Sequence, residues 1–471
     1  MNVLIWFKRD LRAHDHAALA CAAGLGAVLP VYIVEPDYWA LPDTSARQWA
    51  FTAECLEDLR QQLADLGASL LVRVGVAQAV LERLCRQHNI TQIVSHAEIG
   101  NAFSHARNQA VQHWARSAGI IWTELPQSDP EQPAMIDNLR ALNGAEPGQI
   151  PTARSLRLAD DSCAHRQRGG RSQAIDLLEG FLSHRGESYR TTTHSPLAAE
   201  RGSSRLSPHL ALGTISSAEV TQALQTRLAE RPGGRWNAAL GSFQSLLNAR
   251  TLNKPCLETP PKPLGPSASA ELLRRNSDAA RLHAWQNGET GLPYLDACLR
   301  YLAATGWLNH RARAMLIGFA ACQLRLDWRV AGAFLARRLT DYDPGIHWSQ
   351  VQIQCGTDET TPPRLYNPIK QGDAHDPHGL FTRRWIPELS AVPDAHLQAP
   401  WRWSGAGRVL GRRYPEPIVD IATAQRDARE AVWGVRRKPV ARADIVEVLE
   451  RQVSPSPKRG QASHGQLFLD L

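Results

Sequence analysis

The 471-residue sequence contains no apolar run of about 18–20 residues, the length that a membrane-spanning helix needs. Its first segment, MNVLIWFKRDLR, holds an apolar run that is too short for a signal peptide. The basic residues also follow this run, whereas a signal peptide would place them before it. These absences predict a cytoplasmic protein without a membrane partner.

Closely spaced cysteines are missing as well. The eight cysteines form no CxxC pair and are scattered over the whole chain. This distribution argues against a zinc site and against a disulfide framework. An iron–sulfur cluster gathered from distant cysteines has no supporting spacing either.

Lysine is rare, so arginine carries nearly all of the positive charge behind the formal net charge of +7 and the pI of about 9.1. The planar arginine fork suits the recognition of phosphate groups. A genome that favours arginine codons would give the same bias. The charge therefore permits nucleic-acid binding without requiring it.

Short apolar runs alternate with helical patterns over the first 125 residues. The predicted buried strands are Val3–Phe7, Val28–Val34, Leu70–Val74, Ile93–Ser95 and Ile120–Leu125. The predicted helix faces between them are formed by Leu56, Leu59, Leu63 and Leu66 and by Ala106, Ala110, Trp114 and Ala118. This alternation predicts a doubly wound parallel sheet. No GxGxxG follows the first strand, so an NAD-type fingerprint is absent.

The strand signals end after the first 125 residues. Prolines and polar residues mark a long connection from Pro126 to about Asp161, of the kind that joins domains. From about Gly169 onward apolar residues follow helical spacing, with one break at the proline-rich insert Pro255–Pro266. The predicted fold is therefore α/β plus all-α. An α/β domain covers residues 1–126, a linker 127–168, a helical domain 169–435, and a tail 436–471 that is disordered towards its end.

Three segments of the helical half concentrate polar residues. Gly202–Pro208 places small hydroxyl residues before a helix, where they either bind a phosphate or form an ordinary N-cap. The run NHRAR opens a strongly apolar helix, so its arginines need an acidic partner or a ligand. Asp341–Trp348 has the spacing DxDxxxH, but no cluster of further metal ligands accompanies it. We favour pairing of Asp341 with Arg313 or Arg311 and predict no metal.

The order of these motifs resembles the DNA photolyase/cryptochrome family. WQNGETGLP at Trp285, TGW ending at Trp307 and DWR at Asp327 look like the FAD-binding core of that family. RLYNP at Arg364 and a GxFxRxWxPEL run at Gly379 extend the resemblance, and GSSRLSP is similar to the family's flavin-phosphate loop. WFKRDLR near the start resembles its opening motif. The match covers residues 1 to about 430 in one consistent order.

This resemblance implies a bent FAD buried in the helical domain. His310 stands where the family usually has an asparagine against the flavin, and Arg313 matches the arginine beside the isoalloxazine ring, with Asp341 as its partner. Asp343 matches the acid near the ribose, and His347 falls near the position that faces flavin N5. The residues implied to hold the phosphates are Ser203, Ser204, Arg205, Leu206 and Ser207, with Tyr189 nearby.

Tryptophans of this family commonly pass an electron from the surface inward to the photoexcited flavin. Trp285 and Trp328 match the outer and middle positions of that path. Trp348 is the nearest candidate for the inner position, although Ser349 or Val351 could occupy it instead. The alternative role of Trp348 is core packing.

The expected substrate face departs from that of DNA photolyases. The segment that matches their W-R-E-F motif reads SLLNART from Ser245 and contains neither an aromatic nor an acidic residue. Ala314 stands where repair enzymes carry a methionine that contacts the lesion, and Met315 comes one step later. Together with GIHW before Ser349, the pattern resembles a less studied bacterial cryptochrome-like branch.

Three functions therefore stay open. The first is that of a deoxyribodipyrimidine photolyase-type lyase, which transfers an electron from reduced FAD to a pyrimidine dimer in single- or double-stranded DNA. The second is that of a cryptochrome-type blue-light photoreceptor, whose flavin photoreduction is read by a signalling partner. The third is a flavoprotein with no role in light. The resemblance also implies a folate or flavin antenna chromophore in the N-terminal domain, for which Glu98 is a candidate contact.

Overall fold

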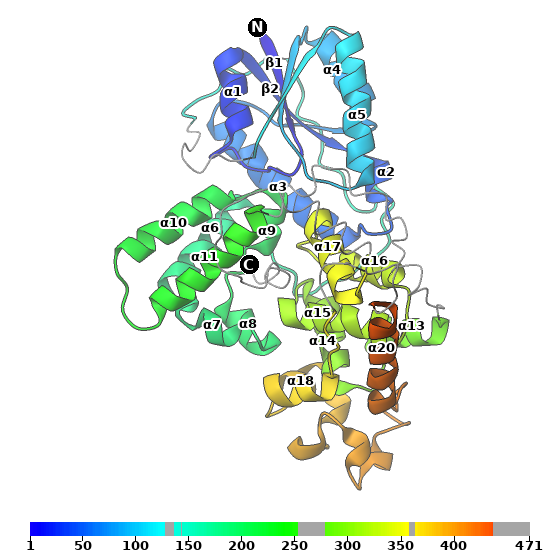
Figure 1. Ribbon diagram of the computed structural model, residues 1–471. Helices are drawn as coiled ribbons and strands as arrows, with labels where there is room; N and C mark the ends of the chain where they lie inside the picture. Colours follow the sequence, from blue (N-terminus) through cyan, green and yellow to red (C-terminus); the bar gives the residue numbers. More distant parts are fainter. Residues whose placement is uncertain (128–135, 143, 253–277, 358–362, 437–471) are drawn as a thin grey trace.

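The computed structural model describes residues 1–127, 136–142, 144–252, 278–357 and 363–436 (Figure 1). Five parallel strands form one sheet in the order β3-β2-β1-β4-β5. The strands are β1 (Asn2–Phe7), β2 (Ala27–Val34), β3 (Leu71–Val74), β4 (Gln92–His96) and β5 (Ile121–Leu125). Val3 pairs with Val28 on one side and with Gln92 on the other, so β1 is central. The parallel sheet predicted from the sequence is confirmed, but β5 is an edge strand and is not buried as predicted, since Ile121 is exposed.

Helices cover both faces of this sheet because successive side chains of β1 point to opposite sides. Val3, Ile5 and Phe7 belong to one core with the first and third helices, whereas Leu4 and Trp6 belong to another with the fourth and fifth. These helices are α1 (Ala17–Leu25), α3 (Ala46–Asp65), α4 (Ala77–Gln87) and α5 (Ala102–Ser117), with the short α2 (Pro36–Trp39) after β2. The sheet is therefore doubly wound, as predicted.

One predicted helix face is right for Trp114 and wrong for its alanines. Helix α5 exists, but Ala106 and Ala110 are exposed, and the residues that α5 buries include Val111 and Trp114. The free energy gained on burial grows with the apolar area that is removed from water. A valine and a tryptophan gain more than alanines do, so their side of the helix faces the core.

The remaining helices form the C-terminal half. They are α6 (Arg171–Gly180), α7 (Tyr189–Thr192), α8 (Pro196–Gly202), α9 (Ser207–Leu212), α10 (Ser217–Ala229), α11 (Trp236–Leu252), α13 (Ala279–Asn287), α14 (Pro293–Thr305), α15 (His310–Gly318), α16 (Trp328–Arg338), α17 (Pro344–Cys355), α18 (Pro368–His375), α19 (Leu380–Trp385) and α20 (Ile421–Arg436). Helices α6, α7, α9, α10 and α11 enclose one apolar core, and the elements from α13 onward enclose a second, to which α8 contributes Ala199. Figure 1 shows both groups on the same side of the α/β domain, in green and in yellow to brown.

The segment between β5 and α6 contains neither a helix nor a strand among its described residues. It lies along the α/β domain: Leu139 N–H donates to Leu66 O at 2.7 Å, and Val72 N–H donates to Pro147 O at 2.7 Å. The insert Pro255–Pro266 and the tail beyond residue 436 lie outside the described residues.

The WFKRDLR motif connects the two halves. Arg9 donates to Ala211 O at 3.1 Å and to Tyr342 O at 2.7 Å, and Arg12 donates to Gly213 O at 3.1 Å. Gly213 has a φ of +65°, and a Cβ there would lie 2.5 Å from Arg9 O, so only glycine allows this approach. The opening motif is therefore part of the domain junction.

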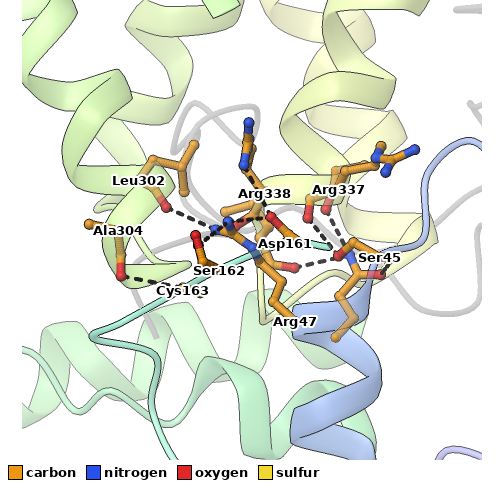
Figure 2. A network of polar contacts seen from close by, with 12 residues as sticks. Ser45, Arg47, Asp161, Ser162, Cys163, Leu302, Ala304, Arg337 and Arg338 are labelled. Carbon is orange, nitrogen blue, oxygen red and sulfur yellow. Dashed lines mark hydrogen bonds and ion pairs between the residues drawn. The ribbon is translucent and has the colours of Figure 1, made fainter. Parts of the chain in front are cut away.

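A second junction is the Arg47 network shown in Figure 2. Arg47 at the start of α3 is 1% exposed and donates to both oxygens of Asp161, at 2.6 and 2.7 Å. It also donates to Leu302 O at 3.3 Å and to Arg338 O at 3.1 Å, at the ends of α14 and α16. Ser45 Oγ donates to Arg337 O at 2.7 Å. One buried guanidinium thus joins the α/β domain, the linker and the helical half.

Candidate functional site

A cavity with an empty volume of about 390 Å³ lies among α14–α17. Most of its wall is apolar, but polar side chains from α15 and α17 also reach it. The lining residues are Leu302, His310, Arg313, Ala314, Ile317, Leu335, Leu339, His347, Gln350, Val351 and Gln354. The predicted site residues His310, Arg313 and His347 therefore meet at one cavity.

Arg313 forms a buried ion pair with Asp341, with N–O distances of 3.0 and 2.7 Å. Asp341 Oδ2 also accepts from Ser207 Oγ at 2.6 Å, which connects this pair to the segment GSSRLSP. Burial by itself would raise the pKa of Asp341, but Arg313 and then Ser207 stabilise the carboxylate, and the pKa lies below its ordinary value. The pairing of Asp341 with Arg313 is confirmed.

The segment from Ser203 to Ser207 runs from the end of α8 into α9 and is buried throughout. Arg205 adopts a φ of +63°, and its guanidinium lies 3.9 Å from the centroid of the Trp307 ring. Ser204 Oγ accepts from Leu206 N–H at 3.3 Å. The loop is thus held in a tight conformation within the helical half.

Two further predicted site residues, Asp343 and Tyr189, contact the helices around α11. Asp343 forms an ion pair with Arg250 at 3.0 Å. Arg250 lies in the same SLLNART segment that lacks the expected aromatic and acidic residues, and sequence reasoning missed this pair. Tyr189 packs edge-on against Phe181 and Phe243 in the core of the α6–α11 group.

The two histidines of the cavity wall are both buried. His347 Nε2 lies 2.9 Å from Gly332 O, and since a carbonyl only accepts, this nitrogen carries the ring proton and Nδ1 carries a lone pair. Burial is the main cause that lowers the pKa of His347 to about 4, so the ring is neutral at pH 7.

Comparisons with known proteins agree with this geometry. Residues 249–434 match the family model described as the FAD binding domain of DNA photolyase, and residues 3–132 match the model described as DNA photolyase. The chain belongs to the DNA photolyase/cryptochrome family.

Relatives of the photolyase/cryptochrome family align over nearly their whole length. A Cryptochrome DASH of Natronomonas pharaonis is 28% identical and covers 89% of this chain and 98% of its own. A Deoxyribodipyrimidine photo-lyase of Escherichia coli (strain K12) is 29% identical and covers 92% and 99%. The structure of a bacterial class III photolyase from Agrobacterium tumefaciens aligns with a TM-score of 0.80 at 25% identity, covering 93% and 98%. A Synechocystis cryptochrome at 24% identity shows the same fold, with a TM-score of 0.81 over 91% and 99%.

The FAD of this photolyase/cryptochrome fold fits the polar groups around the cavity. Within the described part of the chain, several buried polar atoms have no hydrogen-bond partner: Ser203 Oγ, Arg205 Nη1, Asn309 Oδ1, Gln350 Oε1 and both polar side-chain atoms of Gln354. Leaving such an atom unpaired costs about 1–3 kcal/mol. A ligand that carries phosphates, hydroxyls and a polar ring system would satisfy them.

The tryptophans depart from the sequence-based expectation. Trp285, expected at the outer position, is 0% exposed and packs against Phe334 at a centroid distance of 5.3 Å. The structure therefore does not place it at the surface. The ring centroids of Trp328 and Trp348 are 6.3 Å apart, and the centroid of Trp348 is 5.3 Å from that of the cavity residue His347. This contact agrees with the order that the family resemblance implies, in which Trp348 is the nearest candidate for the place inside Trp328.

A second cavity, with an empty volume of about 520 Å³, opens in the α/β domain beyond the carboxyl ends of β1 and β2. Its wall combines aromatic rings, such as Trp6 and Tyr38, with charged groups. Glu98 lines it and pairs with Arg107, which also pairs with Glu35 at 3.0 Å. The predicted antenna residue Glu98 therefore lies at a cavity.

Sequence reasoning missed a buried cluster of Asp10, His16 and His96. His16 Nδ1 accepts from Leu19 N–H and His96 Nε2 accepts from Ala18 N–H, so each other ring nitrogen donates to Asp10 Oδ2, at 3.0 and 2.8 Å. Both rings thus turn N–H groups towards the carboxylate, and a metal would need lone pairs there. The cluster is a closed hydrogen-bond network.

No helix among the described ranges combines the length and the apolar character needed to cross a membrane.

Proposed function

We propose that this protein is a blue-light-absorbing FAD flavoprotein that repairs pyrimidine dimers in DNA by light-driven electron transfer. The observation that carries the flavin assignment is the buried Arg313–Asp341 pair, which faces a cavity whose surroundings hold unpaired polar atoms. Bound FAD supplies one-electron chemistry, and the chain supplies binding and electrostatics.

Each site residue has a proposed part in holding the flavin. Arg313, oriented by its ion pair with Asp341, would present guanidinium N–H groups at the cavity wall as hydrogen-bond donors for the ring system. His347 offers a lone pair on Nδ1. This atom would accept a hydrogen bond from a flavin N–H, but it has no proton to donate to an unprotonated flavin nitrogen. His310 lines the same wall. Ser203, Ser204, Arg205, Leu206 and Ser207 would enclose the phosphates, with Asp343 near the ribose and Tyr189 behind the loop.

Trp328 and Trp348 form the proposed path for photoreduction, because their rings are in contact and Trp348 adjoins the cavity wall. Trp285 is fully buried, so we propose it as an interior tryptophan and not as the surface end of the path.

DNA is the proposed partner. Curated relatives are named Deoxyribodipyrimidine photo-lyase, and arginine gives this chain a net charge of +7, which suits phosphate contacts. The second candidate is a cryptochrome-type photoreceptor without repair activity. It is favoured by Ala314, which leaves the cavity wall without the methionine expected there, and by the missing aromatic and acidic residues in SLLNART.

A repair assay separates the two functions. The purified chain with reduced FAD is illuminated with oligonucleotides that carry a pyrimidine dimer, in single and double strands. Light-dependent loss of the lesion supports the lyase. No loss, together with a reversible light-dependent change of the flavin spectrum, contradicts repair and supports the photoreceptor.

The second cavity is the proposed site of a folate or flavin antenna chromophore. An archaeal photolyase from Sulfolobus tokodaii is described with two FAD molecules, with the implication of a novel light-harvesting cofactor, and it shares the fold at 24% identity with a TM-score of 0.74. The aromatic rings and the Glu98–Arg107 pair supply stacking surfaces and hydrogen-bonding groups. Reconstitution with each chromophore, followed by a measurement of excitation transfer to FAD, tests this site.

We also propose a cytoplasmic location for the protein, and cell fractionation tests that location.

A further inference from the structure

Three hydrogen-bonded side chains lead from the neighbourhood of the cavity residue His347 to the α/β domain. Trp348 Nε1–H donates to Tyr342 Oη at 3.1 Å, and the Tyr342 hydroxyl donates in turn to Asp43 through a short hydrogen bond. An indole N–H can only donate and a carboxylate can only accept, so the direction of this chain is fixed. Tyr342 and Asp43 are buried, and Asp43 lies between α2 and α3. We call Trp348, Tyr342 and Asp43 the tyrosine relay.

The relay reaches the cavity through Trp348. The Trp348 ring lies 5.3 Å from the ring of His347, which lines the cavity. It packs against Gly332 of α16, where an added Cβ would lie 2.8 Å from Trp348 Cζ3. His347 Nε2–H donates a hydrogen bond to the backbone carbonyl of the same glycine. The missing side chain at Gly332 therefore makes room for Trp348, while its backbone carbonyl holds His347.

We propose that Tyr342 refills Trp348 with an electron after photo-oxidation, while its proton passes to Asp43. This inference rests on the flavin photoreduction proposed above. One electron leaves Trp348 for the photoexcited oxidised flavin, and an indole cation radical remains. One electron then moves from Tyr342 to Trp348, the Tyr342 O–H bond breaks, and the proton joins the Asp43 carboxylate. The flavin would then hold the electron that Tyr342 lost, and the protein would hold a neutral indole, a neutral tyrosyl radical and a carboxylic acid.

Trp328 is a second candidate to refill Trp348, because the ring centroids of Trp328 and Trp348 are 6.3 Å apart. The guanidinium of Arg329 lies 4.5 Å from the centroid of the Trp328 ring. That cation binds the neutral ring favourably and repels a cation radical on it. Tyr342 avoids this repulsion because it loses a proton together with the electron. The structure therefore favours the tyrosine as the end of the path.

Tyr342 starts as a neutral phenol. Burial and then the neighbouring Asp43 raise its pKa well above the ordinary value, so the proton stays on the hydroxyl until an electron is removed. Asp43 is the nearest acceptor for that proton, since it already accepts the hydroxyl hydrogen bond.

The test is electron paramagnetic resonance of the full chain with oxidised FAD bound, after a light flash and without added reductant. Ring-deuterated tyrosine should narrow the radical signal, whereas ring-deuterated tryptophan should leave it unchanged. Tyr342→Phe should abolish the tyrosyl signal and leave a tryptophan radical. Asp43→Asn should reduce the tyrosyl yield strongly, because an amide cannot take up the proton.

Tyr414→Phe is the matched control, since Tyr414 is also buried and also donates to a buried carboxylate, that of Asp296. Across the residues that the structure covers, no indole N–H donates to the Tyr414 hydroxyl, so this variant should keep the wild-type signal. A tryptophan radical in the wild type, or a tyrosyl signal that survives in Tyr342→Phe, overturns the relay while photoreduction stands. Absence of any photoreduction in the wild type overturns the proposed photoreduction path on which the relay rests, whereas the repair assay with reduced FAD tests the proposed repair function separately. The labelled wild type decides the question even if a variant fails to fold.

Discussion

Replacing Arg47 by methionine tests whether the Arg47 network holds the two halves together (Figure 2). Arg47 is 1% exposed and forms a bidentate pair with Asp161, and it also binds the carbonyls of Leu302 and Arg338. Removing one member of a buried pair costs about 3–5 kcal/mol, because the other charge stays buried without its partner. Arg338 remains 3.1 Å from Asp161 and offsets part of this loss. We therefore expect a loss of about 3 kcal/mol in the free energy of unfolding.

Urea unfolding, followed by circular dichroism and tryptophan fluorescence, measures this loss. The control is Arg86→Met, because Arg86 also pairs with a glutamate at 2.7 Å but is 77% exposed. That variant should cost less than about 1 kcal/mol. Adding Asp161→Leu to Arg47→Met should recover part of the stability, since it removes the unpaired carboxylate. Equal losses in Arg47→Met and Arg86→Met would refute the reasoning.

The other predictions concern the flavin site and the buried histidines. Asp341→Asn should weaken FAD binding at least about tenfold, because Arg313 loses the partner that orients it; a titration of the apoprotein with FAD measures this, and unchanged affinity contradicts the assignment. Trp348→Phe should greatly slow flavin photoreduction, because its ring lies beside the cavity residue His347 and is shared by both proposed electron donors, whereas the buried Trp285→Phe should leave the rate close to wild type; equal rates in both variants would exclude the Trp348 path. Stability should fall as the pH drops from 6.5 towards 3, since burial lowers the folded pKa of His16 to about 3 from the ordinary 6.5 and the unfolded chain protonates first. The urea midpoint of His16→Gln should depend less on pH over this range, and an equal dependence would contradict that role.

The α/β domain could be predicted well because its signals are local. Each strand is a short apolar run, and the alternation with helices restricts the sheet to a parallel, doubly wound arrangement. The prediction failed for the buried face of α5, where Ala106 and Ala110 are exposed. Spacing alone gives equal weight to alanine and tryptophan, whereas burial depends on apolar area.

The flavin site could be predicted by residue type and less well by contact. The pairing of Asp341 with Arg313 follows from the need to neutralise an arginine in an apolar helix. The pair of Arg250 with Asp343 joins two segments 93 positions apart, and neither segment carries a local signal for the other. The closed cluster around Asp10 likewise forms because the ends of β1 and β4 are neighbours in the sheet.

The sequence by itself determined the fold class, the family resemblance and the residue types around the flavin, because these depend on local pattern and on motif order. Only the tertiary structure decided that Trp285 is interior, that Trp328 meets Trp348, and that Tyr342 links Trp348 to Asp43. Electron and proton transfer depend on distances across packed elements. Those distances are set by the way α3, α16 and α17 pack, including the single missing side chain at Gly332.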